Sequence, residues 1–275
     1  MRRRILLIVF SCILLILSLV IFDRINARNA APMPVPSVSG GYYENGFTLR
    51  LTAPSNGSIY YTTDGSTPTA DSTLYQDGIP LENRSSEQNL YNAVQNVVTD
   101  WKNYTPNPQP VEKGTVIRAV FVNERDIASE ILTQTYFIGL QPPERGYTLS
   151  LVFEYDDLFG EDGVYVTGKE YDEWYLSATP SDDAPPPNFE KHLEVTAIAE
   201  IIDNFEDILN QPVGLRLQGN STRGWYKKRF IVESHPELSG SRIFPVDIFP
   251  GVSTHSMMTL RLGTKKRPSP RFSEW

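Results

Sequence analysis

The chain has 275 residues, a formal net charge of −8 and 40% hydrophobic residues, and its one cysteine is Cys12. Lysine and arginine gather near the two ends, so the central body is more acidic than the total suggests. An acidic body argues against a nucleic-acid partner, because nucleic-acid binding needs a basic surface. A disulfide within the chain is excluded, and the length suffices for two domains.

The N-terminal segment, residues 1–22, has the pattern of a transmembrane signal-anchor. Arg2, Arg3 and Arg4 precede residues 5–22, an apolar run that would rise about 27 Å as a helix and match a bilayer. The arginines predict a cytoplasmic N-terminus and an extracytoplasmic body. We therefore expect a single-pass protein of the cell membrane; the alternative is secretion after cleavage of a signal peptide.

Residues 23–37 form a Pro-containing spacer, which we expect to extend as polyproline II. Beyond it, residues 38–138 have the pattern of a small antiparallel β-sandwich. Apolar and polar residues alternate over 47–51, 59–63 and 116–122, the period of half-buried strands. Turn formers such as Asp64-Gly65 separate these runs.

The run Ile59-Tyr60-Tyr61-Thr62-Thr63-Asp64-Gly65-Ser66-Thr67-Pro68 is similar to the chitobiase/β-hexosaminidase C-terminal domain. Other segments follow that family in order: 40–51, 114–119 and 135–138. The resemblance implies an immunoglobulin-like sandwich that accompanies catalytic domains in secreted proteins and is not itself catalytic.

Residues 83–110 are an insertion relative to that family, rich in Asn and Pro. Within it, residues 90–101 carry apolar side chains near helical spacing and predict one short amphipathic helix. Trp101 and Tyr104 lie in its polar part, where we expect exposed rings. They are the candidate glycan contacts and predict a cell-wall glycan or a surface protein as partner.

A linker, residues 139–147, leads into the second module, where 213–217 and 230–232 alternate as strands. Three basic residues lie between them and would project from the turn and from the start of the second strand: Arg223, Lys227 and Lys228. Cations placed there can meet phosphate oxygens. Because successive side chains of a strand point to opposite faces, Lys228 should lie on the same face as the apolar residues that follow it in the strand. The alternative is an ordinary hairpin whose basic residues are solvated.

The run Gly214-Leu215-Arg216-Leu217-Gln218-Gly219, followed by Ser221, Arg223, Lys227, Lys228 and Phe230, is similar to the signature of the CotH kinase family. Further segments fit that family in order: 149–159, 163–166, 194–205, 244–250 and 259–263. Arg229 departs from it, since the family usually has a small hydroxyl residue there. The resemblance implies a β-rich α+β kinase-like half over 148–263, with Arg223, Lys227 and Lys228 as nucleotide contacts.

The family continues with a C-terminal half that holds magnesium and positions the acceptor, whereas residues 264–275 read as a basic tail. Phosphoryl transfer depends on metal and positioning, so we expect an incomplete kinase domain without catalysis of its own. ATP and Mg would be cofactors only of a complete domain. The alternatives are the N-terminal half of an active kinase and a wall polysaccharide-binding module. His192, His235 and His255 show no metal spacing, and neither a catalytic nor a metal-binding residue is predicted.

The predicted fold is therefore mainly β with some α: a transmembrane helix, an immunoglobulin-like sandwich and a β-rich kinase-like half.

Overall fold

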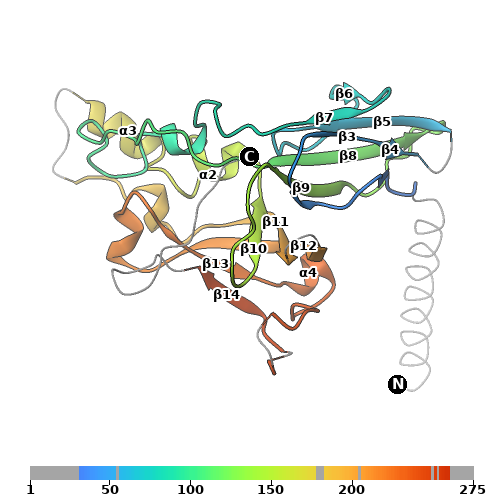
Figure 1. Ribbon diagram of the computed structural model, residues 1–275. Helices are drawn as coiled ribbons and strands as arrows, with labels where there is room; N and C mark the ends of the chain where they lie inside the picture. Colours follow the sequence, from blue (N-terminus) through green and yellow to red (C-terminus); the bar gives the residue numbers. More distant parts are fainter. Residues whose placement is uncertain are drawn as a thin grey trace, which may run out of the picture.

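The computed structural model describes residues 31–53, 56–177, 183–203, 206–248, 251–252 and 254–260. The predicted membrane anchor and the basic tail lie outside the described residues. Within the described ranges, no helix is both long and apolar enough to cross a membrane. The described chain is mainly β, as the sequence patterns predict, and forms two units that lie against each other (Figure 1).

The first unit is a β-sandwich built on a five-stranded sheet in the order β2-β9-β8-β5-β6, with the two-stranded ladders β1-β4 and β3-β7. Its strands are β1 (Val35–Pro36), β2 (Gly41–Tyr43), β3 (Phe47–Leu49), β4 (Leu51–Thr52), β5 (Gly57–Thr62), β6 (Thr73–Leu74), β7 (Ile79–Leu81), β8 (Thr115–Asn123) and β9 (Leu132–Ile138). The strands predicted at 47–51, 59–63 and 116–122 are confirmed. Strand β1 lies within the predicted spacer, and its pairing with β4 in a two-stranded ladder makes that part of the chain a strand of the sandwich.

The sandwich core forms because alternate side chains of these strands point inward. Leu49, Ile117, Phe121 and Tyr136 are fully or almost fully buried in it. Gly57 allows two strands to approach closely: a Cβ there would lie 2.3 Å from the carbonyl oxygen of Val122.

The second unit is a five-stranded antiparallel meander in the order β10-β11-β12-β13-β14. Its strands are β10 (Thr148–Val152), β11 (Glu194–Asp203), β12 (Glu206–Gln218), β13 (Arg229–Glu233) and β14 (Met257–Leu260). Its helices are α2 (Tyr155–Phe159), α3 (Lys169–Leu176) and α4 (Pro236–Ser239), with 3₁₀ turns η2 (Asn188–Glu190) and η3 (Ser221–Gly224). The strands predicted at 213–217 and 230–232 are confirmed as β12 and β13.

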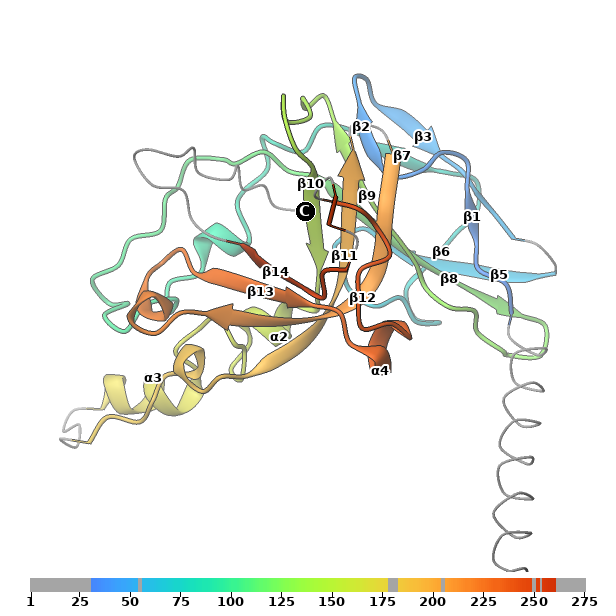
Figure 2. The same ribbon diagram turned by 90° about the horizontal axis from the view of Figure 1, so that it is seen from below.

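The two units are joined through side chains of β9 and β11, which run close together in both views (Figures 1 and 2). The buried Glu200 carboxylate accepts hydrogen bonds from the backbone N–H of Thr135, at 3.0 Å, and from the Thr135 hydroxyl. At the next contact, Arg118 pairs with Glu154 at 2.8 Å. Tyr42 and Phe137 of the sandwich form a small buried cluster with Ile202 of β11.

The insertion, residues 83–110, is an arm that leaves the sandwich and lies along the second unit beside α2 and α3 (Figure 1). The helix predicted at 90–101 is wrong, because only η1 (Tyr91–Ala93) is helical there. The arm's backbone carbonyls accept bonds from the second unit instead of from helical N–H groups. The carbonyl of Asn96 accepts from the N–H of Thr167 at 2.8 Å, and that of Val97 from Lys228 Nζ at 2.7 Å.

Candidate functional site

A cleft of about 450 Å³ opens where the arm meets the second unit, and we call it the junction cleft. The described residues that line it are Tyr91, Asn92, Val94, Val97, Tyr104, Asn107, Val111, Phe153, Leu158, Phe159, Tyr165, Tyr226, Lys227, Lys228 and Phe230. Its size falls in the range of small-molecule sites, which are mostly apolar with a few polar groups. None of these lining residues carries a carboxylate.

Aromatic rings form a continuous wall of the junction cleft. Tyr91 of the arm stacks on Phe159 with ring centroids 5.1 Å apart, and Phe159 lies 5.4 Å from Tyr165. Tyr165 in turn stacks on Phe230 at 5.7 Å. The chain of rings therefore crosses from the arm through α2 to strand β13, so both units are needed to build the wall.

Lys228 lines the cleft, and its ammonium is held by main-chain carbonyls. Its Nζ donates to the carbonyls of Val97 at 2.7 Å, of Trp225 at 3.0 Å and of Arg223. The same Nζ lies 4.0 Å from the centroid of the Phe189 ring. Burial lowers the pKa of the Lys228 ammonium to about 7, and the Glu190 carboxylate opposes this shift. Lys228 and Phe230 line the same cleft, but so does Lys227, for which strand alternation predicts the opposite face; both lysines precede the first residue of β13.

Tyr165 fixes the loop that carries the two lysines. Its hydroxyl donates to the carbonyl of Tyr226 at 3.1 Å and accepts from the backbone N–H of Lys228 at 3.0 Å. Burial raises the pKa of the Tyr165 hydroxyl to about 12, which keeps it protonated and able to donate.

The structure separates the three predicted nucleotide contacts. Lys227 and Lys228 both line the junction cleft, and Lys227 is exposed. Arg223 is buried in η3 and is not part of the lining; its Nη2 lies 3.0 Å from His192 Nδ1. Burial lowers the pKa of Arg223.

Neither of the two candidate glycan contacts is an exposed ring, so that expectation is wrong. Trp101 is half-buried and donates its indole N–H to Asp172 Oδ1 at 2.8 Å. Its ring meets Tyr175 of α3 edge-on, with centroids 5.6 Å apart. Tyr104 is half-buried and stacks on Tyr226 at 6.2 Å. Of these two residues, only Tyr104 lines the junction cleft.

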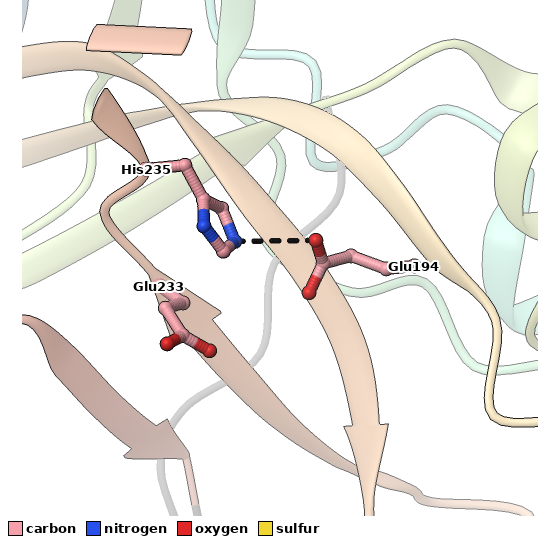
Figure 3. A group of neighbouring side chains, drawn as sticks. All are labelled: Glu194, Glu233 and His235. Atoms are coloured by element: carbon pink, nitrogen blue, oxygen red, sulfur yellow. Dashed lines mark ion pairs between the residues drawn. The ribbon is translucent and has the colours of Figure 1, made fainter. Parts of the chain in front are cut away.

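A second group of polar side chains lies on the sheet of the second unit, away from the junction cleft. Glu194, Glu233 and His235 offer ligand atoms within 4.8 Å of one another (Figure 3). His235 Nε2 lies 3.2 Å from Glu194 Oε1. Spacing along the chain did not indicate this group, because β11 and β13 meet there only through their pairing with β12.

The guanidinium of Arg216 pairs with both carboxylates of this group. Its Nε lies 3.4 Å from Glu194 Oε2 and its Nη2 lies 3.1 Å from Glu233 Oε2. Arg216 thus already supplies the positive charge that a metal ion would bring. Gly214 makes room for the group, since a Cβ there would lie 2.6 Å from His235 Nε2. We interpret the four side chains as an ion-pair network of the sheet.

The fold and the junction cleft define a β-sandwich joined to a β-sheet unit, with a ligand-sized cleft between the sandwich's arm and the sheet unit. Residues 38–133 match the family model of the chitobiase/beta-hexosaminidase C-terminal domain. This match covers the described sandwich from β2 to the start of β9 and includes the arm. No curated protein and no solved structure matches the chain.

Proposed function

We propose that this chain is a membrane-anchored, extracytoplasmic bacterial protein in which the sandwich is an accessory to a CotH-like unit. In this proposal the two form one ligand-binding body without phosphoryl transfer of its own. Residues 5–22 would hold the body at the membrane, with the N-terminus in the cytoplasm. Wall glycans or surface proteins would be its partners outside the cell.

The junction cleft is the observation that carries the ligand-binding role. Rings from both units line it, together with Lys227 and Lys228. A mostly apolar cleft with a few polar groups is the usual form of a small-molecule site. The absence of a carboxylate among its described lining residues argues against a bound Mg²⁺, which prefers carboxylate oxygens. Phosphoryl transfer without that metal lacks its main source of charge neutralisation.

A phosphoryl-transfer assay tests the catalytic half of this proposal. The purified full chain, in detergent, is incubated with radiolabelled ATP, Mg²⁺ or Mn²⁺, and protein acceptors. We expect incorporation at the level of a heat-denatured sample. Robust labelling of an acceptor, or of the chain itself, would instead support the alternative of an active CotH-type kinase half.

Membrane attachment is tested separately by fractionation of cells that express the full chain. We expect the protein in the membrane pellet after alkaline extraction, and its body digested by protease added to spheroplasts. A matched chain with Leu14→Arg and Leu15→Arg in the apolar run should leave the pellet, because central arginines oppose insertion. Release of a shortened wild-type chain into the medium would support the signal-peptide alternative.

Binding of a wall polysaccharide is the second candidate function. The name of the matched domain refers to chitobiase and β-hexosaminidase, which places a similar sandwich in a carbohydrate context. The aromatic wall of the junction cleft favours the same class, because sugar rings pack on aromatic faces. Retention of the full chain on purified cell walls, compared with a Tyr104→Ala variant, is the direct measurement.

A further inference from the structure

The charged groups of the junction cleft already have partners within the protein. The Lys228 ammonium donates to three main-chain carbonyls, and Lys227 makes an interaction of its own. The described lining contains no carboxylate that could meet a cationic ligand. A charged ligand would have to displace existing contacts or lose its hydration without a counter-charge, and both are costly. An uncharged ligand avoids both costs.

Ring surface is what the cleft leaves uncovered. Phe159, Tyr165 and Phe230 pack against the core of the second unit but stay half-buried, and all three line the cleft. Tyr226 stacks on Tyr104 of the arm and is still 56% exposed. Neighbouring rings of the lining lie 5.1 to 6.2 Å apart, a spacing at which aromatic rings stack. A further planar ring can therefore continue the series and cover apolar surface of both units.

The polar groups of the lining distinguish a planar ring from a sugar ring, since aromatic walls accept both. The hydroxyl of Tyr165 already donates to one main-chain group and accepts from another. Asn107 Oδ1 accepts from the N–H of Gln109 at 3.1 Å, and Asn92 makes an interaction of its own. A sugar brings several hydroxyls, and each one that is buried without a partner lowers the affinity. A planar ring compound carries few such groups and fits this lining better.

Building on the ligand-binding role proposed above, we propose that the junction cleft binds a small uncharged compound with a planar ring system, held by stacking and apolar contact. The ring system packs on Tyr226 and along the half-buried rings of the second unit, and Tyr104 and Val94 of the arm add apolar contacts. Because the arm belongs to the sandwich and Tyr226 to the sheet unit, such a ligand is held by both units at once.

Calorimetric titration of the full chain in detergent tests this ligand class, with the heat of each probe in protein-free detergent subtracted. Four probes share one skeleton and differ in charge or planarity: naphthamide is uncharged and planar, naphthoate is its anionic counterpart, naphthamidine its cationic one, and decalin carboxamide its saturated, non-planar one. Diacetylchitobiose and ATP with Mg²⁺ represent the sugar and nucleotide alternatives. We expect naphthamide to bind roughly fivefold more tightly than the saturated amide, the value of one stacked ring pair, and roughly tenfold more tightly than either charged probe.

Matched variants assign the stacking contact. Tyr226→Leu and Tyr104→Leu keep apolar bulk but remove the ring, so each is expected to bring the affinity for naphthamide down to that for the saturated amide. Tyr147→Leu, at an exposed tyrosine outside the described lining, is the control and should keep the preference for the planar probe. Unchanged thermal midpoints establish that each variant is folded, and the exposed Tyr226 tests the contact even if Tyr104→Leu destabilises the arm.

The outcomes separate the ligand class from the ligand-binding role. Tighter binding of naphthoate or naphthamidine than of naphthamide overturns the uncharged ligand. Equal binding of the planar and saturated amides, or a preference that survives Tyr226→Leu, overturns the stacking contact. Tighter binding of diacetylchitobiose or ATP than of naphthamide overturns the planar ring compound and favours the sugar or the nucleotide. Each of these results leaves the ligand-binding role standing, whereas failure of every probe to bind up to its solubility limit contradicts both.

Discussion

At the scale of single residues, Glu200 is the buried acid that joins the two units. It is fully buried, and its carboxyl oxygens accept from Thr135 of the sandwich. Burial raises its pKa from 4.5 to about 8, although the bonds from Thr135 and Ser150 oppose the shift. Between these two pH values the unfolded chain has lost the proton and the folded chain has kept it. The free energy of unfolding should therefore fall as pH rises through this window, by about 1 kcal/mol per pH unit.

Glu200→Gln tests this dependence, because glutamine stays neutral and keeps an acceptor and a donor. We expect the variant to unfold at a higher temperature than wild type at pH 7.5 and at nearly the same temperature at pH 4.5. Glu124→Gln, an exposed acid in the turn after β8, is the matched control and should follow wild type at both values. If the unfolding free energy of Glu200→Gln changes with pH as steeply as that of wild type, Glu200 is ionised in the folded protein.

Lys228 provides a second prediction at this scale. Lys228→Met keeps most of the side-chain volume but leaves the carbonyls of Val97, Arg223 and Trp225 without this donor. Each unsatisfied buried group costs about 1–3 kcal/mol, and some of them will recruit water, so we expect a loss of roughly 2–4 kcal/mol. Urea unfolding measures it, with Lys191→Met, a partly exposed lysine paired with Glu170, as control. A loss of unfolding free energy no larger than that of the control would contradict a stabilising role for the three carbonyl contacts of Lys228.

At the scale of elements, Asp172 of α3 holds the arm. Its two oxygens accept from Asn96 Nδ2 and from the indole N–H of Trp101, both at 2.8 Å. Asp172→Asn replaces one acceptor with a donor, so one of these bonds must be lost. We expect trypsin to cut the arm of this variant at the exposed Lys102 roughly tenfold faster than in wild type. This factor corresponds to the loss of one hydrogen bond to a charged group, which makes local opening of the arm easier. Asp162→Asn, in the exposed turn after α2, should leave the cleavage rate unchanged; equal acceleration would mean that the arm is held elsewhere.

How far the sequence predicts these elements depends on how local their signals are. Strands β8 and β12 follow from alternation within a few residues, and that period is visible without knowing any partner. The helix predicted at 90–101 does not form: the apolar spacing there is helical, but the carbonyls of Asn96 and Val97 accept from Thr167 and Lys228. Lys228 lies 131 residues from its partner Val97 in the chain, and only the folded structure brings the two together. The same holds for Glu194 and Glu233, which meet through sheet register.

At the scale of the whole molecule, the central contacts between the units are buried. Ile202 of β11 is fully buried against Tyr42 and Phe137 of the sandwich, whose rings stack at 4.7 Å. Together with Glu200 and the Arg118–Glu154 pair, this interface should prevent one unit from unfolding while the other stays folded. Calorimetry of the full chain should then show one transition whose calorimetric and van't Hoff enthalpies agree.

Ile202→Ala should weaken the interface itself. The substitution removes buried methyl groups at a cost of about 2–5 kcal/mol and leaves each unit's own core in place. We expect the single transition to broaden or divide, so that the van't Hoff enthalpy falls below the calorimetric one. Leu215→Ala, in the core of the second unit alone, is the matched control: it should lower the midpoint while the two enthalpies stay equal. If the wild type already unfolds in two separate steps, the units are independent, and a ligand held between them would have to bring them together by its own binding energy.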